Sequence, residues 1–315
     1  MTHQTKRDRW LGDRHLGLGG SDAPAALGCD PWRSTLALYH EKRGDIEPDD
    51  IGDNPRVYWG HVLEPAVRAE VKRRVGIPVC NPGRYTIQRS EAHPFMFCTL
   101  DGLLRYATDP VHQLFQLDDQ PTPNGPGVVE IKTAGHFSRE QWEERWPLHY
   151  QVQTQHQLAV TGHTWGLVAV LIAGFDFRLY PFTADPEFQK AMIDSERGFW
   201  DLVQTGTPPD ADASQSTADA LRKLYPVDDG ETIDLPAEAG IWDHRLVNAK
   251  AERKNIDETI RECENKLRAA IGSASVGVMP NGTSYTHKLQ KRKAYTVDAK
   301  EFRVLRRLKP PKEKP

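Results

Sequence analysis

The stretch GVVEIKT, residues 127–133, is the feature that most restricts how this chain can fold. Its branched apolar residues predict a buried strand, yet Glu130 and Lys132 interrupt the apolar run. Side chains alternate along a strand, so residues two apart share one face. One face of this strand therefore carries a carboxylate and an ammonium group. On these residues alone, a solvated edge strand or a same-face ion pair explains the pattern as well as a functional site does.

The rest of the chain alternates between apolar runs and amphipathic stretches, which predicts a mixed α/β (α+β) fold with a central mixed sheet flanked by helices. Runs of aromatic and branched residues predict strands at 84–88, 95–106, 127–133, 164–173 and 176–182. Apolar residues three to four apart predict helices at 22–28, 34–44, 58–76, after Pro147 and from Asp185. Ser21 and Ser34 are the expected caps of the first two helices. The polar residues 107–126 predict a surface loop, with or without a hairpin of its own.

The domain organisation follows from a change of composition near residue 209. Residues 1–209 are expected to form the main domain, and the small, polar and proline residues of 210–240 a linker. Residues 241–315 are expected to form a helical arm followed by a basic hairpin and tail, with hairpin-like strands within 282–302. The arm, 241–271, carries an apolar stripe over about four heptads, which indicates a short coiled-coil-like element.

Charge is distributed unevenly along the 315 residues. The net charge is −3, but residues 285–315 hold eleven Lys or Arg against three acidic residues. This tail therefore has a balance of +8 on an acidic body, which suits a surface that binds anions. A solvated, frayed end explains the same composition equally well. If the tail does bind DNA, Lys291, Arg292 and Lys293 are the expected contacts.

Cysteine usage and hydropathy narrow the class of protein. Cys29, Cys80, Cys98 and Cys263 are scattered without a C-x-x-C pair, so we expect free, mostly buried thiols in a reducing compartment. No apolar run approaches the length of a membrane span, and the N-terminus lacks an apolar signal region. We therefore expect a cytoplasmic protein, in a bacterium or a phage-infected cell, with no membrane partner.

A second carboxylate completes a candidate site. Asp101 ends the apolar part of the preceding strand, directly before Gly102, so Asp101 and Glu130 are expected on neighbouring strands with Lys132 beside them. Two carboxylates can share a hard cation such as Mg²⁺, which prefers oxygen ligands. A lysine there can orient a water or neutralise charge developing on a phosphate. The pattern predicts metal-assisted phosphodiester hydrolysis.

Asp101, Glu130 and Lys132 together resemble the active site of the PD-(D/E)XK nuclease superfamily. Further motifs follow in the order of the YqaJ-type viral recombinase family, which includes the phage lambda exonuclease. They are Trp10 with Arg14, GLGGSD with Ser21, WGHVLEPAV with Glu64, TLDG, VVEIKT and HYQVQTQHQLAVTG. The resemblance covers about residues 8–205 and implies a restriction-endonuclease-like core. Residues 241–310 resemble, through weaker motifs, the C-terminal extension of some of its members.

The resemblance implies roles for the matching residues. Asp101, Glu130 and the backbone carbonyl of Ile131 would bind the metal, which Mn²⁺ could replace, and Glu64 would complete the acidic site. Lys132 would position the attacking water. Gln153 would stand at the edge of the site, with Gln151, Gln155 and Gln157 as close rivals. Trp10, Arg14 and Ser21 match the segment that would grip the 5′-phosphate. An arginine matches the geometry of a phosphate, and a serine beside a helix N-terminus adds hydroxyl and backbone donors.

Two features depart from this simple set of oxygen ligands on adjacent strands. His61, His149 and His156 lie in the same motifs, but oxygen ligands suit Mg²⁺ better. The 28 residues between Asp101 and Glu130 make a long connection, which is either a substrate-contacting insertion or decoration.

The leading hypothesis is a Mg²⁺-dependent exonuclease that degrades one strand of duplex DNA from its 5′ end in phage-type recombination. Its partners would be double-stranded DNA ends and a single-strand annealing protein, and family members can form trimeric rings. An endonuclease or resolvase on the same core is the first alternative. A catalytically inactive DNA-binding recombination partner is the second, although the intact Asp101, Glu130 and Lys132 argue against it.

Overall fold

The computed structural model describes residues 5–49, 52, 54–294, 296, 299 and 303–308. It divides into two compact units, Met1–Tyr225 and Pro226–Pro315, and each is described by itself. In the described part of the chain no helix is long and apolar enough to cross a membrane.

The first unit is built on a four-stranded mixed sheet in the order β4-β5-β6-β7. The strands are β4 (Gly102–Leu104), β5 (Gly127–Ala134), β6 (Trp165–Ile172) and β7 (Asp176–Thr183). β4 and β7 run antiparallel to their neighbours, whereas β5 and β6 are parallel, with Glu130 opposite Val168. The parallel pair needs a crossover, and α6 (Leu148–Thr161) supplies it.

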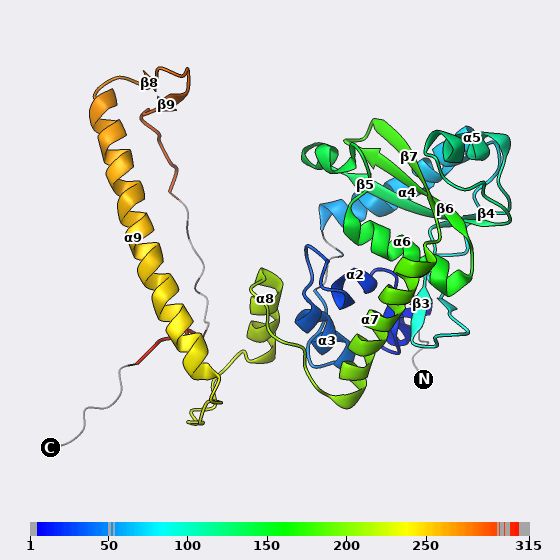
Figure 1. The fold of residues 1–315 in the computed structure, drawn as a ribbon, viewed down its shortest axis with the longest axis horizontal. Helices are drawn as coiled ribbons and strands as arrows, with labels where there is room; N and C mark the ends of the chain where they lie inside the picture. Colours follow the sequence, from blue (N-terminus) through cyan, green and yellow to red (C-terminus); the bar gives the residue numbers. More distant parts are fainter. Residues whose placement is uncertain are drawn as a thin grey trace. The chain divides into compact units, whose positions relative to one another are not determined.

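Helices cover both faces of this sheet (Figure 1). One face packs against α6 through Val128, Val168 and Val170, and it is the face that carries Glu130 and Lys132. The other face packs against α4 (Pro55–Val75) and α5 (Asp109–Leu117). Glu130 is only 2% exposed, so the sheet buries the carboxylate instead of leaving it on a solvated edge. The predicted mixed sheet flanked by helices is confirmed.

A smaller sheet and the N-terminal helices complete the unit. The smaller sheet has the strand order β1-β3-β2. Its strands are β1 (Leu18–Gly19), β3 (Met96–Cys98) and β2 (Gln88–Arg89). Around it lie α1 (Lys6–Arg14), α2 (Ala23–Ala26), α3 (Thr35–Arg43) and α7 (Pro186–Thr205), with η1 (His136–Trp142) after β5. Ser34 caps α3 by accepting from the N–H of Ala37, as predicted.

Several local predictions for this unit were wrong. The strand expected at 84–88 is reduced to β2 at Gln88–Arg89, because Arg84 and Tyr85 form a turn. The run 95–106 is not one strand, because the chain leaves the small sheet after Cys98 and enters the large sheet at Gly102. The segment 107–126 contains α5, which the polar flanks concealed and which buries Val111 and Phe115. Ser21 does not cap α2: the N-cap is Asp22, and the Ser21 hydroxyl accepts from Arg14 instead.

The segment expected as a linker contains a helix. α8 (Gln215–Leu224) begins at Ser214, whose hydroxyl accepts from the N–H of Thr217. The Thr217 hydroxyl donates to Ser34, so α8 packs on the start of α3 and extends the first unit to Tyr225.

The second unit contains α9 (Ala239–Ile271) and a hairpin of β8 (Val276–Val278) and β9 (Ser284–Thr286). The long helix was predicted. The hairpin lies earlier than expected, because its turn is at Asn281 and Gly282 and 287–294 have no regular structure. Most of 295–302 and all of 309–315, where a further strand and a frayed end were expected, lie outside the described residues.

Candidate active site

Asp101 and Glu130 meet where β4 joins β5. Gly102 pairs with Val129 in the antiparallel ladder, which places Asp101 beside the next residues of β5. One carboxylate oxygen, Oδ2 of Asp101, accepts from the backbone N–H of Ile131 at 2.9 Å. The N–H and C=O of a strand residue point to the same side, so the Ile131 carbonyl also faces this edge. The sequence prediction that these residues adjoin is met by the fold.

Lys132 and two glutamines hold the Glu130 carboxylate in place. Lys132 Nζ lies 2.6 Å from Glu130 Oε1, and the amides of Gln153 and Gln157 each donate to one Glu130 oxygen at 2.7 Å. Gln153 also accepts from Lys132 Nζ at 3.1 Å through its Oε1. Lys132 further lies over the ring of Tyr150, 4.4 Å from its centroid. Tyr150, Gln153 and Gln157 all belong to α6 and lie about one turn apart on the face that meets β5.

The four glutamines predicted on α6 differ in the groups to which their amides donate. Gln153 and Gln157 face Glu130, whereas Gln151 donates to the Trp146 carbonyl and Gln155 to the Thr183 carbonyl. Sequence reasoning placed only Gln153 in the site. The four-residue spacing of Gln153 and Gln157, one helical turn, was the signal that would have added Gln157.

Glu64 reaches the same edge from α4 by way of an arginine. Arg68, four residues later on the helix, forms an ion pair with Glu64 and donates to the backbone carbonyl of Asp101 at 2.9 Å. Arg68 was missed from the sequence, where it is one basic residue among several. Its Nε is buried without a partner. Glu64 is therefore held toward Asp101 by a cation.

The electrostatics of the site follow from the close approach of the Asp101 and Glu130 carboxylates. Burial, and next the Glu130 carboxylate, raise the pKa of Asp101 to about 8. Burial acts to lower the pKa of Lys132, but Glu130 outweighs it and raises that pKa above its ordinary value. Lys132 is thus a charged ammonium, and the carboxylate pair is one that a cation would stabilise.

The donor set suits a hard divalent cation. Asp101, Glu130 and the Ile131 carbonyl offer oxygen, and Mg²⁺ is commonly bound through one or two carboxylates with substrate and water completing its shell. In the part of the chain that the structure describes, no group of three or more His, Cys, Asp or Glu side chains is arranged to hold a metal ion. Glu64 is paired with Arg68, so such a cation would rest on two protein carboxylates.

The histidines in these motifs do not gather at the carboxylates. His156 is fully buried and occupied at both nitrogens, by Glu196 at 2.9 Å and by the Phe97 carbonyl at 2.8 Å. His149 stacks edge-on against Trp32, and His61 is exposed on α4. Burial lowers the pKa of both His149 and His61. These contacts agree with the expectation that oxygen ligands form the site.

A cationic cluster lies close to the glutamines. Asp22 is completely buried and accepts from Arg14 at 3.2 Å, Arg33 at 2.7 Å and Lys42 at 2.7 Å. Burial alone would raise the pKa of Asp22, but Lys42, Arg14 and Arg33 hold it well below its usual range. Arg33 also pairs with Glu41, so three cations share two carboxylates and one positive charge is in excess.

Ser21 is exposed at the edge of this cluster, and Arg14 is partly exposed beside it. Arg14 Nη2 donates to the Ser21 hydroxyl at 3.1 Å, and its guanidinium lies 4.8 Å from the Trp10 ring centroid. Trp10 is anchored by its Nε1, which donates to Thr99 at 3.2 Å. Arg14 and Ser21 line a small pocket of about 70 Å³ together with Gln153 and Gln157, the two glutamines that donate to Glu130. The rest of its lining is Gly19, Gly20, Phe97 and Thr99.

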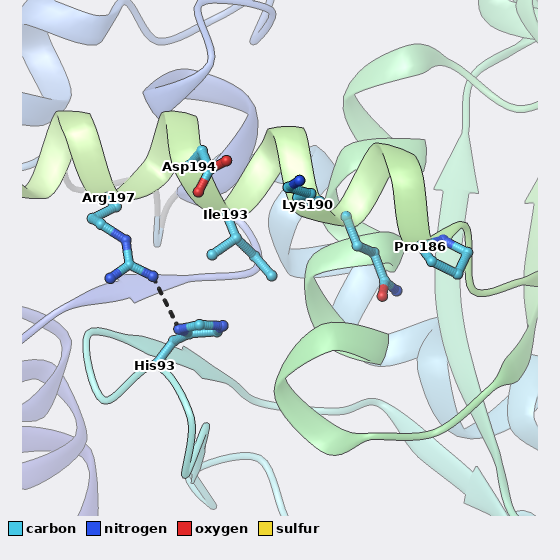
Figure 2. Close-up of a pocket in the computed structure, with 7 residues that line it drawn as sticks. His93, Pro186, Lys190, Ile193, Asp194 and Arg197 are labelled. Carbon is cyan, nitrogen blue, oxygen red and sulfur yellow. Dashed lines mark hydrogen bonds between the residues drawn. The ribbon is translucent and has the colours of Figure 1, made fainter.

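A second pocket shares no lining residue with this arrangement. A wider pocket of about 300 Å³ is lined by His93 and one side of α7, where Arg197 donates to His93 Nδ1 at 3.2 Å (Figure 2). Its lining includes none of the predicted site residues. Lys291, Arg292 and Lys293 belong to the second unit and are exposed without regular secondary structure.

The free thiols lie outside the candidate site. Cys98 is buried, and burial raises its pKa to about 12, whereas Cys29 and Cys80 are half-buried. Cys263 on α9 is exposed, which the expectation of mostly buried thiols did not anticipate. None of the four is paired in a disulfide, as predicted.

Comparison with known proteins finds chains similar to this one. It is 27% identical over 283 residues to the uncharacterized protein YqaJ of Bacillus subtilis (strain 168), covering 88% of this chain and 82% of that protein. An alkaline exonuclease from Laribacter hongkongensis matches with a TM-score of 0.48 and 16% identity over 64% of this chain and 94% of that one. A phage-related exonuclease from Haemophilus somnus 129PT matches with a TM-score of 0.40 and 10% identity over 62% and 98%.

The family model of the YqaJ-like viral recombinase domain matches residues 9–164, the stretch that contains Arg14, Ser21, Glu64, Asp101, Glu130, Lys132 and Gln153. Residues 9–164 therefore form a YqaJ-like viral recombinase domain.

Proposed function

We propose that this protein is a Mg²⁺-dependent deoxyribonuclease that hydrolyses duplex DNA from a 5′ end during phage-type recombination. The observation that carries the proposal is the Asp101 carboxylate beside the buried Glu130, with the Lys132 ammonium 2.6 Å from Glu130. The match of residues 9–164 to the viral recombinase domain supports a DNA substrate.

The metal would be held by Asp101, Glu130 and the Ile131 carbonyl, with Glu64 beside them. When bound, Mg²⁺ would make a water more acidic and offset charge on the phosphate. Mn²⁺ would serve in its place, because it accepts the same oxygen ligands.

The side chains around the carboxylates have separate tasks. Lys132 Nζ, a protonated donor held by Glu130 and Gln153, would orient the attacking water or a phosphate oxygen. Gln153 and Gln157 each donate to one Glu130 oxygen. The carboxylate is therefore already oriented for the metal ion that it would bind. Arg68 holds Glu64 against the Asp101 backbone and keeps the acidic edge together.

End recognition would lie in the small pocket. Arg14 and Ser21 present a guanidinium and a hydroxyl, and the excess positive charge around Asp22 favours an anion there. Because Gln153 and Gln157 line the same pocket, a terminal 5′-phosphate at Arg14 would lie near the carboxylates that act on the following bond. The C-terminal residues Lys291, Arg292 and Lys293 would add phosphate contacts along the duplex.

End-labelled linear and circular duplexes, with and without a 5′-phosphate, test the proposal in Mg²⁺ and in chelator. An exonuclease releases mononucleotides from the linear substrates only, in Mg²⁺ only. Cleavage of the circular duplex would indicate an endonuclease or resolvase. Binding without cleavage in either Mg²⁺ or Mn²⁺ would indicate an inactive recombination partner. A single-strand annealing protein remains an expected partner in the recombination step that follows.

A further inference from the structure

The long helix α9 carries an apolar surface that its own chain leaves open. None of its 33 residues is buried. Ile256 and Ile260, near its middle, are 59% and 52% exposed. Within the residues that the structure describes, nothing covers these branched side chains, although burying an apolar side chain is favourable. The helix is drawn in yellow and orange in Figure 1.

The exposed apolar residues follow a heptad repeat. Successive positions alternate four and three residues apart, and only Arg253 interrupts the small or apolar character; they are Trp242, Leu246, Ala249, Arg253, Ile256, Ile260, Cys263, Leu267 and Ala270. This average spacing of 3.5 residues keeps one seam facing a neighbouring helix and is the pattern of a coiled coil. The apolar side chains of this seam are therefore expected to pack against a second helix of the same length.

The charges beside the seam decide the direction in which a second α9 would run. In a parallel pair Arg253 would face Arg253 of the partner subunit in the core. Glu252 would then lie beside the partner's Asp257, and Arg245 beside the partner's Lys250. These are like charges at the interhelical positions that set orientation. The parallel arrangement is therefore disfavoured.

We propose that α9 pairs antiparallel with α9 of a second copy of this chain, and so forms a dimer. In the favoured register Ile260 packs against the partner's Ile256, and Leu267 against the partner's Ala249. Lys250 then lies beside the partner's Glu264, and Glu252 beside the partner's Lys266. Two-fold symmetry repeats each of these opposite-charge pairs.

The charge pattern is what selects a second copy as the occupant. A surface that is complementary to itself under a two-fold axis is the requirement for a symmetric dimer. Asp257 facing its own copy at the axis is the single like-charge contact in this register. Sliding one helix by a heptad would place Arg245 beside the partner's Lys266 and Asp243 beside the partner's Glu264. Among the described residues, Lys250 and Glu252 have no ion-pair partner in the monomer.

The first experiment measures the mass of the full chain in solution by sedimentation at micromolar concentrations, against the monomer mass of 35.6 kDa. Ile260→Lys places a charge in the seam and should halve the assembled mass. Val247→Lys is the matched control, because Val247 is 40% exposed on the same helix but lies outside the seam. A monomeric wild type, or equal masses for wild type and Ile260→Lys, would overturn the proposal.

The second experiment tests direction and register. Glu264→Lys should weaken the dimer because it faces the partner's Lys250. Adding Lys250→Glu in the same chain should restore it, since the reversed charges again meet across the interface. The dimer dissociation constant should rise severalfold for the single variant and return for the double one. A double variant that dimerises as poorly as the single one would contradict the antiparallel register, as would a single variant that dimerises like wild type.

Discussion

The ammonium of Lys132 lies 2.6 Å from a carboxylate oxygen of Glu130, two residues earlier on the same face of β5. Glu130 is buried and Lys132 is partly buried between the sheet and α6, where Gln153 contacts both side chains. An exposed same-face pair would contribute little to stability. Here the two charges are held beside a second carboxylate, Asp101, and the proposed hydrolysis rests on this arrangement.

Glu130→Gln and Lys132→Ala should each abolish hydrolysis while leaving the fold and DNA binding largely intact. The reason is that both side chains serve the proposed metal and water more than the core. Asp101→Asn should behave likewise and also weaken metal affinity, because it removes a charged ligand. The measurements are turnover in Mg²⁺, duplex binding in chelator and thermal unfolding. Near wild-type turnover in either of the first two variants would mean that the site is misassigned.

Gln153→Ala should lower kcat more than Gln157→Ala, because Gln153 contacts both Lys132 and Glu130 whereas Gln157 contacts only Glu130. Residues that orient metal ligands typically contribute about 10–100-fold to metal affinity or activity. Gln151→Ala is the matched control on the same helix, since its amide donates to the Trp146 carbonyl. Steady-state rates over a range of Mg²⁺ concentrations separate the three. Equal losses in all three variants would show a general effect on α6.

Arg14→Ala should remove much of the preference for 5′-phosphorylated ends over 5′-hydroxyl ends. A charge-assisted contact to phosphate contributes about 1.5–3 kcal/mol, which is about tenfold or more in rate, and a hydroxyl end lacks it. Ser21→Ala should show a smaller shift, because a neutral donor contributes less. The measurement is the ratio of initial rates on the two substrates.

Arg9→Ala is the control for this prediction, because Arg9 lies on the same helix and is exposed. The phosphate assignment fails if the wild-type ratio is near one. It also fails if Arg14→Ala slows both substrates equally, since that result would point to a structural role through Asp22.

Removing residues 285–315 should weaken duplex binding and flatten its salt dependence. The segment carries a balance of +8, and fewer phosphate contacts release fewer counterions. Cleavage should persist at low salt, because the carboxylate site lies in the other unit. The slope of log K against log salt concentration is the measurement. An unchanged slope would mean that the tail is a solvated end.

The stability of the first unit should fall as the pH rises above about 6.5, the ordinary pKa of histidine. Burial alone would lower the pKa of His156, but the Glu196 carboxylate raises it above that ordinary value. A raised folded-state pKa stabilises the protein fully below the unfolded pKa, and that stability is lost as the pH rises through the folded pKa. Denaturant midpoints from about pH 6 to 9 measure the loss.

Glu196→Gln isolates this effect, because it keeps the shape of the side chain and removes the charge. The variant should be less stable than wild type at about pH 6. Its stability should also change less than that of wild type between about pH 6 and 9. If wild type and variant respond to pH in the same way, the buried pair does not carry the pH dependence.

Much of the site was predictable from the sequence because it depends on the spacing of residues that are neighbours along the chain. Strand alternation alone placed Glu130 and Lys132 on one face, and the branched residues around them predicted burial. The order of motifs placed Arg14, Ser21 and Glu64 in one domain. The seven-residue repeat of α9 was likewise visible, since helical periodicity is a property of neighbouring residues.

Only the tertiary structure decided which partners these side chains meet. Periodicity could not separate Gln153 and Gln157 from Gln151 and Gln155, because the choice depends on how α6 is rotated against β5. The three cations around Asp22 come from separate segments, and Arg68 gains its role from the backbone of Asp101, 33 residues away. α5 was hidden because the burial of Val111 and Phe115 is created by the sheet on which they pack. The local pattern determined which face each residue occupies, and long-range packing determined what lies opposite it.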